Sequence, residues 1–399
     1  MVKKHLWLYL FFGLAGLCIA VFGVVVVLPA VSPAIGAQAA DMVRSVLGPQ
    51  PVADLESASF RIKDSINQYI SSLNGGQVQI SLDQPTFFST SHPNAIKQPS
   101  ADRKLLPTSN AANQSAVAVP VPQSTDVVSA LPQIGWQAYG PTTNGVPLMA
   151  QTLLSLDPQR PYAAIALVRI DLSRLKLHMM PGFLEPSHAK NVVNAIPNLG
   201  MIPLADQSHL IAAFNGGFKA INGNYGMMVD GITLLPPQPG IATLAIYRDG
   251  HVNIGAWEGG ISPTPDMIAY RQNCPLIVQS GQINQMVNVV NYVMWGNTIG
   301  NQDITWRTGV GITQDSRYLI YAVGNGTSVA TLAQALLQAG AYNAMQLDIN
   351  QHYSHFVTYQ PTGIPGRPLM AVQLLNQMEK DNNLYITPHS RDYFYLTGY

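Results

Sequence analysis

The chain has 399 residues, which is enough for one large domain or two ordinary ones with additional segments. Only 11% of the residues are charged, and 21 Lys and Arg balance 21 Asp and Glu, which excludes both a basic nucleic-acid-binding surface and an acidic tail. The two cysteines, Cys18 and Cys274, provide neither a zinc knuckle nor a Cys-x-x-Cys redox pair.

The amino terminus carries a membrane-targeting pattern. Lys3 and Lys4 precede an uncharged run of 23 residues, 6–28, which can span a bilayer core of about 30 Å. The basic end is expected to stay in the cytoplasm, so the rest of the chain lies outside it. The run exceeds the roughly 7–15 residues of a cleaved signal core, which favours an uncleaved signal anchor within residues 1–40. The alternative is secretion after cleavage at Ala37-Gln38-Ala39.

Two segments separate this anchor from the rest of the chain. Within residues 41–74, apolar residues between Val52 and Ile70 recur at helical spacing, which predicts a short amphipathic helix at the membrane surface or a packing helix. Residues 75–133 are rich in Pro, Ser, Gln and Asn and predict a flexible linker. The sequence therefore predicts a globular head, residues 134–399, on a stalk behind a transmembrane helix.

The head is expected to be one α+β domain, partly mixed α/β and dominated by β-structure. Apolar runs predict buried strands at residues 162–171 and 210–215, and alternating residues predict a half-buried strand at 172–178. Turn residues between apolar runs predict three hairpins, which pair residues 242–247 with 251–257, 227–229 with 232–234, and 309–313 with 317–323.

One helix is clear from its periodicity. After Thr327-Ser328, which provide a cap, apolar residues follow one helical face over residues 329–337, and Gly340 ends the helix. A short buried strand at residues 344–348 then completes a right-handed βαβ unit with the strand at residues 317–323. This unit places Asp348 at the carboxyl end of a strand, where open α/β sheets bind ligands.

A second strand end carries the stretch Asn215-Gly-Gly-Phe-Lys219. Two consecutive glycines let the backbone pass close to a ligand and can offer N–H groups to an anion. The alternative is an ordinary hairpin turn, for which Asn-Gly is a common sequence. Asn215 would then share the ligand-binding end of the sheet with Asp348.

The order of these motifs resembles the phosphodiester glycosidase family. The resemblance covers roughly residues 162–359, and it ends at a departure: many members continue Leu-Asp into Gly-Gly-Gly-Ser, whereas residues 349–355 here read Ile-Asn-Gln-His-Tyr-Ser-His. In this respect the chain is similar to an exported bacterial branch of the family. The matching motifs, in chain order, are Phe214-Asn-Gly-Gly-Phe218, Val229-Asp-Gly231, Trp306-Arg-Thr-Gly-Val-Gly311, Thr331-Leu-Ala333 and Gln346-Leu-Asp348.

The resemblance implies an extracytoplasmic, membrane-anchored hydrolase that cleaves a glycosidic or sugar-phosphodiester bond in an envelope or exopolysaccharide glycan. Asp348 would act at the anomeric centre, Arg307 would hold the phosphate and Asn215 would orient the sugar, so these three residues should line one cleft. The residues expected to bind substrate are Gly216, Gly217, Lys219, Asp230, Asn350 and His352.

Two alternatives remain open at this point. No cofactor is expected, although Asp348, His352 and His355 are spaced so that a helix would align them as a divalent metal site. The replaced turn after Asp348 also favours a second function, a catalytically inactive glycan-binding module on a membrane stalk.

Overall fold

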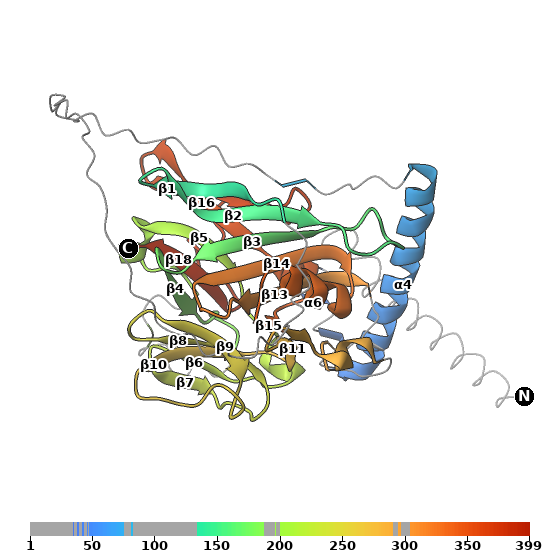
Figure 1. The fold of residues 1–399 in the computed structure, drawn as a ribbon, viewed down its shortest axis with the longest axis horizontal. Helices are drawn as coiled ribbons and strands as arrows, with labels where there is room; N and C mark the ends of the chain where they lie inside the picture. The colour runs from blue at the N-terminus through green and yellow to red at the C-terminus, as the bar shows by residue number, and fades with distance from the viewer. Residues whose placement is uncertain are drawn as a thin grey trace, which may run out of the picture. The chain divides into compact units, whose positions relative to one another are not determined.

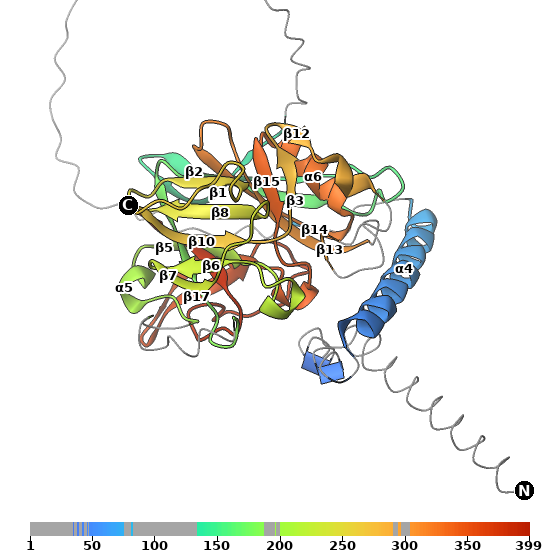
Figure 2. The same ribbon diagram turned by 90° about the horizontal axis from the view of Figure 1, so that it is seen from below.

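The computed structural model of the chain describes residues 48–75, 81–82, 134–186, 196, 200–289, 294–296 and 304–399, with a few single positions between 35 and 46. The predicted transmembrane run, residues 6–28, and nearly all of the predicted linker lie outside the described residues. Within the described part, no helix is long and apolar enough to cross a membrane. The described residues form a β-rich structure with few helices (Figures 1 and 2).

Three sheets build the head. The largest has the strand order β1-β2-β3-β14-β13-β15-β11-β12, and two five-stranded sheets have the orders β7-β6-β10-β8-β9 and β17-β16-β5-β18-β4. The strands are β1 (Gln137–Thr143), β2 (Val146–Leu154), β3 (Ile165–Asp171), β4 (Leu175–Met180), β5 (Leu210–Asn215), β6 (Met227–Val229), β7 (Ile232–Leu235), β8 (Ala242–Tyr247), β9 (Val252–Ala256), β10 (Met267–Gln272), β11 (Leu276–Gln279), β12 (Gln282–Ile283), β13 (Thr305–Ile312), β14 (Tyr318–Thr327), β15 (Asn343–Gln346), β16 (Phe356–Ile364), β17 (Arg367–Gln373) and β18 (Tyr393–Gly398).

The local sequence patterns correspond to real elements. The three predicted hairpins are confirmed as the antiparallel pairs β8–β9, β6–β7 and β13–β14. The predicted helix is α6 (Val329–Gln338), and the Ser328 hydroxyl caps it by accepting a bond from the Thr331 amide at 3.1 Å. Gly340 follows with a φ of 97°, a conformation that glycine adopts without steric cost. Short helical segments α5 (Leu204–Gln207), η3 (Ala220–Asn222), η4 (Gln285–Asn288) and η5 (Gln351–Tyr353) lie in the connections.

Two long-range arrangements differ from the prediction. Strands β14 and β15 flank α6 in sequence, but β13 lies between them and pairs antiparallel with both, so the expected βαβ unit is split. Strand β5 lies between β16 and β18 and is antiparallel to each. Asn215 therefore ends a strand of an antiparallel sheet, and the argument from open parallel α/β sheets is wrong for it.

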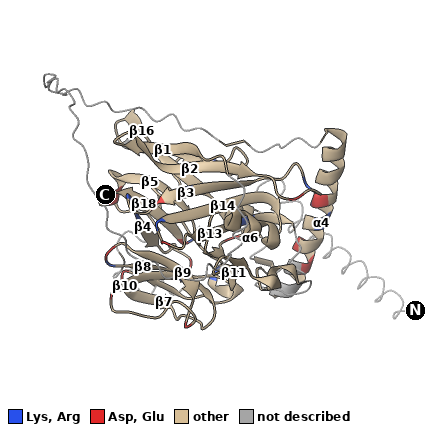
Figure 3. Cartoon of the chain, viewed as in Figure 1, with Lys and Arg blue, Asp and Glu red and all other residues tan. Residues whose placement is uncertain are grey.

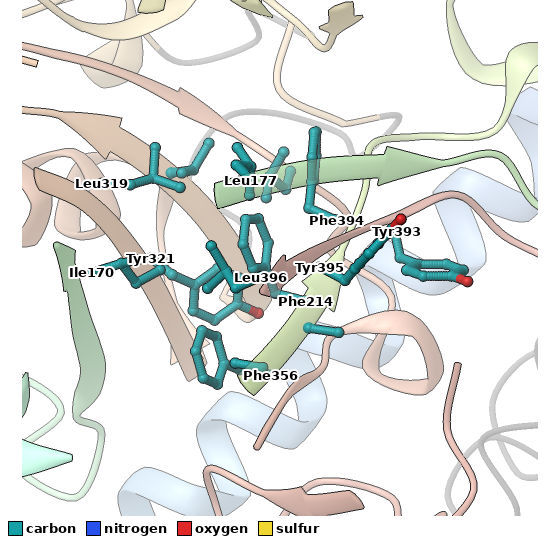
Figure 4. Close-up of a cluster of buried hydrophobic side chains, with 14 of the residues drawn as sticks. Ile170, Leu177, Phe214, Leu319, Tyr321, Phe356, Tyr393, Phe394, Tyr395 and Leu396 are labelled. Atoms are coloured by element: carbon teal, nitrogen blue, oxygen red, sulfur yellow. The ribbon is translucent and has the colours of Figure 1, made fainter. Parts of the chain in front are cut away.

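The central strands of the eight-stranded sheet, β13 and β14, are buried on both faces. Along β14, Tyr321 and its alternate neighbours pack against the sheet that contains β5, whereas Ile320 and Ala322 pack against α6. Phe214 of β5 and Tyr321 lie with ring centroids 5.2 Å apart, inside an aromatic cluster completed by Phe356 and Phe394 (Figure 4). This packing presses the end of β5 against β13 and β14, which positions the candidate site.

The predicted amphipathic helix is α4 (Pro49–Leu73), and it contacts the head. The Asp64 carboxylate accepts bonds from Arg160 Nε at 2.8 Å, Arg160 Nη2 at 2.6 Å and the Tyr162 hydroxyl at 2.9 Å. A forked guanidinium–carboxylate pair of this kind is stronger and more directional than a single ion contact. The helix before the linker is therefore bonded to the start of the head.

Candidate functional site

Asn215 forms a complete hydrogen-bond junction at the end of β5. Its Nδ2 donates to Gly216 O at 3.0 Å and to Thr308 Oγ1 at 2.9 Å. Its Oδ1 accepts from the Tyr321 hydroxyl at 2.8 Å and from the His355 amide at 3.2 Å. These four bonds use the hydrogen-bonding capacity of a side-chain amide, and the residue is 2% exposed. In this structure Asn215 orients protein groups.

The junction extends directly to Asp348. Thr308 Oγ1 donates to the Asp348 carbonyl at 2.5 Å, and the Asp348 amide donates to Gly216 O at 3.1 Å. Asn215 bonds both Thr308 and Gly216, so it fixes the peptide that carries the Asp348 side chain. The structure therefore brings two of the three predicted catalytic residues together, with Asn215 in a positioning role.

The Asp348 carboxylate is paired with a residue that sequence reasoning missed. Its Oδ2 accepts from Arg391 Nη2 at 2.7 Å and its Oδ1 accepts from the Asn350 amide at 2.9 Å. The Asp348 and Arg391 side chains are 7% and 5% exposed. The Arg391 guanidinium also lies 4.4 Å from the centroid of the Tyr353 ring. The sequence contained one signal for Arg391, because it forms an adjacent charged pair with Asp392 before an apolar strand. Charged residues are otherwise sparse in this chain (Figure 3).

The position of Asp392 explains why residues 216 and 217 are both glycine. It forms an ion pair with Arg271 at 2.8 Å, and both side chains are 1% exposed. The Gly217 amide donates to Asp392 Oδ2 at 3.1 Å, and the Gly216 amide donates to Asp392 O at 3.0 Å. A Cβ on Gly216 would lie 1.9 Å from Asp392 Oδ2. The glycines thus permit close approach to a buried ion pair, and their amides bond protein atoms.

Arg307 lies apart from the other two predicted catalytic residues. Adjacent residues of a strand point to opposite faces, so Arg307 and Thr308 diverge. Arg307 is fully buried, and its Nη1 donates to Gln346 Oε1 at 2.7 Å and to the Trp295 carbonyl at 3.1 Å. The expectation that Arg307 lines one cleft with Asp348 is not met in the described residues, because strand alternation directs its guanidinium to the other face of the sheet.

A cavity of about 500 Å³ opens beside Arg391, a volume typical of ligand sites. Its wall includes two of the predicted substrate-binding residues, Lys219 and His352. Glu379 holds His352, with 2.5 Å between Glu379 Oε2 and His352 Nδ1. The Lys219 ammonium lies 5.6 Å from the centroid of the Tyr353 ring. The cavity therefore combines cations with an oriented imidazole, and Asp348 meets it through Arg391.

Two further histidines belong to the cavity wall, and His355 is buried whereas His389 is partly buried. Burial lowers the pKa of His355 to about 3 and the pKa of His389 to about 4, so both are neutral at pH 7. His355 Nε2 lies 2.6 Å from the His352 carbonyl, and its Nδ1 is buried without a hydrogen-bond partner in the described structure. His389 Nδ1 accepts from the Arg391 amide at 3.2 Å, which holds the start of β18.

The remaining predicted residues have local roles. Asn350 caps η5, where its Oδ1 accepts from the His352 amide at 3.0 Å. Asp230 occupies the β6–β7 turn with a φ of 50°. Its pKa is raised, mainly by burial and to a smaller extent by the negative charge of nearby Asp206. It is not part of the cavity wall. Among the described residues, no three His, Cys, Asp or Glu side chains are grouped to hold a metal ion. The helix that would align Asp348, His352 and His355 does not form, because the helical segment at this place is η5, which covers Gln351–Tyr353 alone.

Residues 208–348 match the family described as phosphodiester glycosidase. Among solved structures, the catalytic domain of zebrafish N-acetylglucosamine-1-phosphodiester alpha-N-acetylglucosaminidase is similar, with 13% identity, a TM-score of 0.39 and coverage of 66% of this chain and 88% of that one. A hypothetical protein from Synechocystis has 12% identity, a TM-score of 0.35 and coverage of 66% and 64%. An exported protein from Burkholderia pseudomallei has 11% identity, a TM-score of 0.32 and coverage of 59% and 74%. None of the curated proteins matches the chain.

Replacing Gly216 by alanine tests the packing beneath the turn. The added methyl group has no room beside Asp392, so we expect Gly216→Ala to lower the free energy of unfolding by about 1–3 kcal/mol. Gly259→Ala is the matched control, because its Cβ would meet its nearest neighbour at 3.4 Å. Urea denaturation of both variants measures the difference, and equal stability would contradict the close approach.

The buried histidines predict acid sensitivity. His178 is partly buried and stacks on Tyr395, and desolvation lowers its pKa to about 4. An unfolded histidine binds a proton below about pH 6.5, whereas folded His178 does so only near pH 4, so folding stability falls as the pH drops through this window. We expect His178→Gln to reduce the loss of Tm between pH 7 and pH 4.5, and exposed His251→Gln to leave it unchanged. A wild-type Tm that does not fall would refute the assignment.

Proposed function

Because residues 208–348 carry the phosphodiester glycosidase match, we propose that the head is a hydrolase that cleaves a sugar-phosphodiester bond in the cavity beside Arg391. The observation that carries this proposal is the buried Asp348–Arg391 pair. Asp348 is the last residue of the matched segment, and Arg391 connects it to the cavity wall. A carboxylate can stabilise an oxocarbenium-like transition state, and a guanidinium can hold a phosphate.

Asp348 is the proposed group at the anomeric centre. Glycosidic cleavage passes through an oxocarbenium-like transition state, whose positive charge a carboxylate stabilises. Oδ1 of Asp348 accepts a bond from the Asn350 amide and Oδ2 accepts one from Arg391, and a carboxylate oxygen can accept two. A phosphate leaving group departs as a stable anion, so the reaction needs little proton donation to it. Burial strengthens the interaction between Asp348 and developing charge, because the site is shielded from water.

Arg391 and Lys219 are the proposed phosphate contacts. Arg391 lines the cavity, and its Nη2 is bonded to Asp348. Its Nε is buried without a protein partner in the described structure, so a shift of the side chain toward the cavity would let Nε donate to a phosphate oxygen. Lys219 adds a second positive charge on the same wall. Arg391 thereby takes the role that sequence reasoning gave to Arg307, whose guanidinium faces the other side of the sheet.

His352 is the proposed general base. Glu379 binds His352 Nδ1, which leaves Nε2 as the acceptor of a proton. In the hydrolytic step, the water oxygen bonds to the anomeric carbon while the carbon–oxygen bond to phosphate breaks. The electron pair leaves with the phosphate and the water proton passes to His352. The unusual turn after Asp348 would then supply the base.

The proposed function includes membrane anchoring and a glycan substrate outside the cytoplasm. Residues 6–28 would anchor the chain in the cell membrane with the head outside the cytoplasm, and the substrate would be an envelope or exopolysaccharide glycan. The competing function is a catalytically inactive glycan-binding module, because the cavity wall can bind a sugar phosphate without cleaving it.

Substitution of the ion pair tests the enzyme proposal. With a synthetic sugar-1-phosphodiester as substrate, we expect Asp348→Asn to lower kcat by roughly 10²–10³-fold, because an amide cannot stabilise the developing cation. Arg391→Lys should raise KM, because the single ammonium of lysine cannot reproduce the fixed geometry in which one guanidinium nitrogen bonds Asp348 and another bonds the phosphate. Arg248→Lys, on the exposed β8–β9 turn, is the control. Binding of the substrate without turnover by the wild-type protein would instead support the binding module.

Substitution of His352 tests the base. His352→Gln should lower kcat, because glutamine cannot accept a proton from water, while Glu379→Gln should lower activity by about 10²-fold or less through loss of orientation. His251→Gln, outside the cavity, should retain full activity. Full activity in His352→Gln, with turnover still dependent on Asp348, would remove His352 from the mechanism and leave the hydrolase proposal intact.

A further inference from the structure

Helix α4 exposes a row of large apolar side chains. Five of them, here called the α4 stripe, follow one another at intervals of four, three, one and three residues, which places them on one helical face. Each side chain would be expected in a core, yet the exposed fractions range from 41% to 67%. The α4 stripe consists of Ile62, Ile66, Tyr69, Ile70 and Leu73.

The opposite face of α4 is the one that contacts the head. Ser57, Asp64 and Ser71 recur every seven residues on that face and are largely buried. Asp64 carries the forked pair with Arg160 and the bond from Tyr162. Arg160 is fixed in turn by Asp157 at 2.8 Å. A surface helix normally turns its apolar face inward, so the part of α4 from Ile62 to Leu73 is reversed with respect to the head, whereas Val52 near its start is buried.

This reversal requires an apolar environment outside the head. Contiguous exposed apolar surface marks a binding surface for a membrane or another protein. The described part of the head does not cover the α4 stripe, because the bonds of Asp64 hold the helix by its other side. The remaining question is what lies against the stripe.

The neighbouring sequence favours a lipid surface. The uncharged run 6–28 ends 20 residues before α4 begins at Pro49, which keeps the helix within reach of a bilayer that holds this run. Between Ile62 and Leu73 the acidic residue is Asp64, which is paired with Arg160 away from the stripe, so anionic headgroups meet no exposed carboxylate there. Tyr69 has the amphipathic ring that is enriched at membrane interfaces.

We propose that the α4 stripe lies in the headgroup–acyl boundary of the membrane and that the Asp64–Arg160 pair attaches the head to this helix. The proposal rests on the membrane anchoring included in the proposed function, and it is independent of catalysis. An amphipathic helix lies flat in the interface with its apolar face toward the acyl chains. Helix α4 then holds the head at the membrane surface, so the position of the head does not depend on how far the linker, residues 75–133, extends.

Spin labelling of the full chain in vesicles of phosphatidylcholine and phosphatidylglycerol tests the proposal. Nitroxide labels are placed at Ile66→Cys and, in a second sample, at Ser72→Cys, an exposed position of the same helix outside the stripe. A Cys18→Ser background avoids a competing label, and Cys274 is buried. Ile62→Cys repeats the measurement at a second stripe position, and an unchanged Tm shows that each labelled chain is folded.

The accessibility of each label to oxygen and to a water-soluble nickel chelate gives the outcome. We expect the labels at 66 and 62 to be accessible to oxygen and at least fivefold less accessible to the chelate than the label at 72. Equal chelate accessibility at all three positions would overturn the proposal, as would a full chain that does not associate with the vesicles. Protection of position 66 from both reagents with spin–spin broadening would also overturn it, because a second copy of the chain would then cover the stripe.

An Arg160→Gln variant separates the two parts of the proposal. Loss of the forked pair should leave the label at 66 in the lipid and should increase the distance from a fluorophore at Asp249→Cys, on the β8–β9 turn, to a labelled lipid. Arg248→Gln, on the same turn and exposed, is the control. An unchanged distance in Arg160→Gln would show that the Asp64 pair does not attach the head, and turnover by either variant is not needed to read this result.

Discussion

The hydrogen-bond junction around Asn215 is the constraint on which the site depends. Strand β5 belongs to one sheet and strands β13 and β14 belong to another, and Asn215 bonds Thr308 and Tyr321 across the boundary. A buried polar group left without a partner costs roughly 1–3 kcal/mol, so the sheets cannot shift without losing several such bonds together. Thr308 passes this constraint to the Asp348 peptide. A side chain in the core thereby fixes the position of the Asp348 carboxylate, which pairs with Arg391 of the cavity wall.

Two neighbouring residues at the start of β18 place charge on both sides of this junction. Asp392 pairs with Arg271 beneath the glycine turn, and Arg391 pairs with Asp348 beside the cavity. Burying an ion pair carries a large desolvation cost, and the protein has few charged residues overall. The interior pair holds the turn through the Gly217 amide. The outer pair involves a residue of the cavity wall, Arg391, whose Nε is buried without a hydrogen-bond partner in the described structure.

Helix α4 has polar contacts on one face and exposed apolar side chains on the other. Its polar row bonds the head while its apolar row faces outward, and both rows are visible in the spacing of the sequence. Periodicity shows that a helix has two faces, but it does not show which face a domain will take. The bonds of Asp64 decide this point for α4, because a carboxylate with three donors at one site holds the helix in one rotation.

The sequence alone determined the elements whose signals are local. The hairpins, the Ser328 cap and the Asn-Gly-Gly strand end depend on neighbours a few residues apart, and the family match was already visible in the order of its motifs. Tertiary structure decided the partners. Arg391 and Asp348 are 43 residues apart, and Gly217 and Asp392 are 175 apart, so no periodic pattern connects them. By residue type, Arg307 was a reasonable candidate for the phosphate-binding group beside Asp348. Side chains of β13 alternate between the two faces of the sheet, so Thr308 contacts Asp348 and Arg307 points to the opposite face. Which face each side chain takes depends on how the strand is placed between its neighbours.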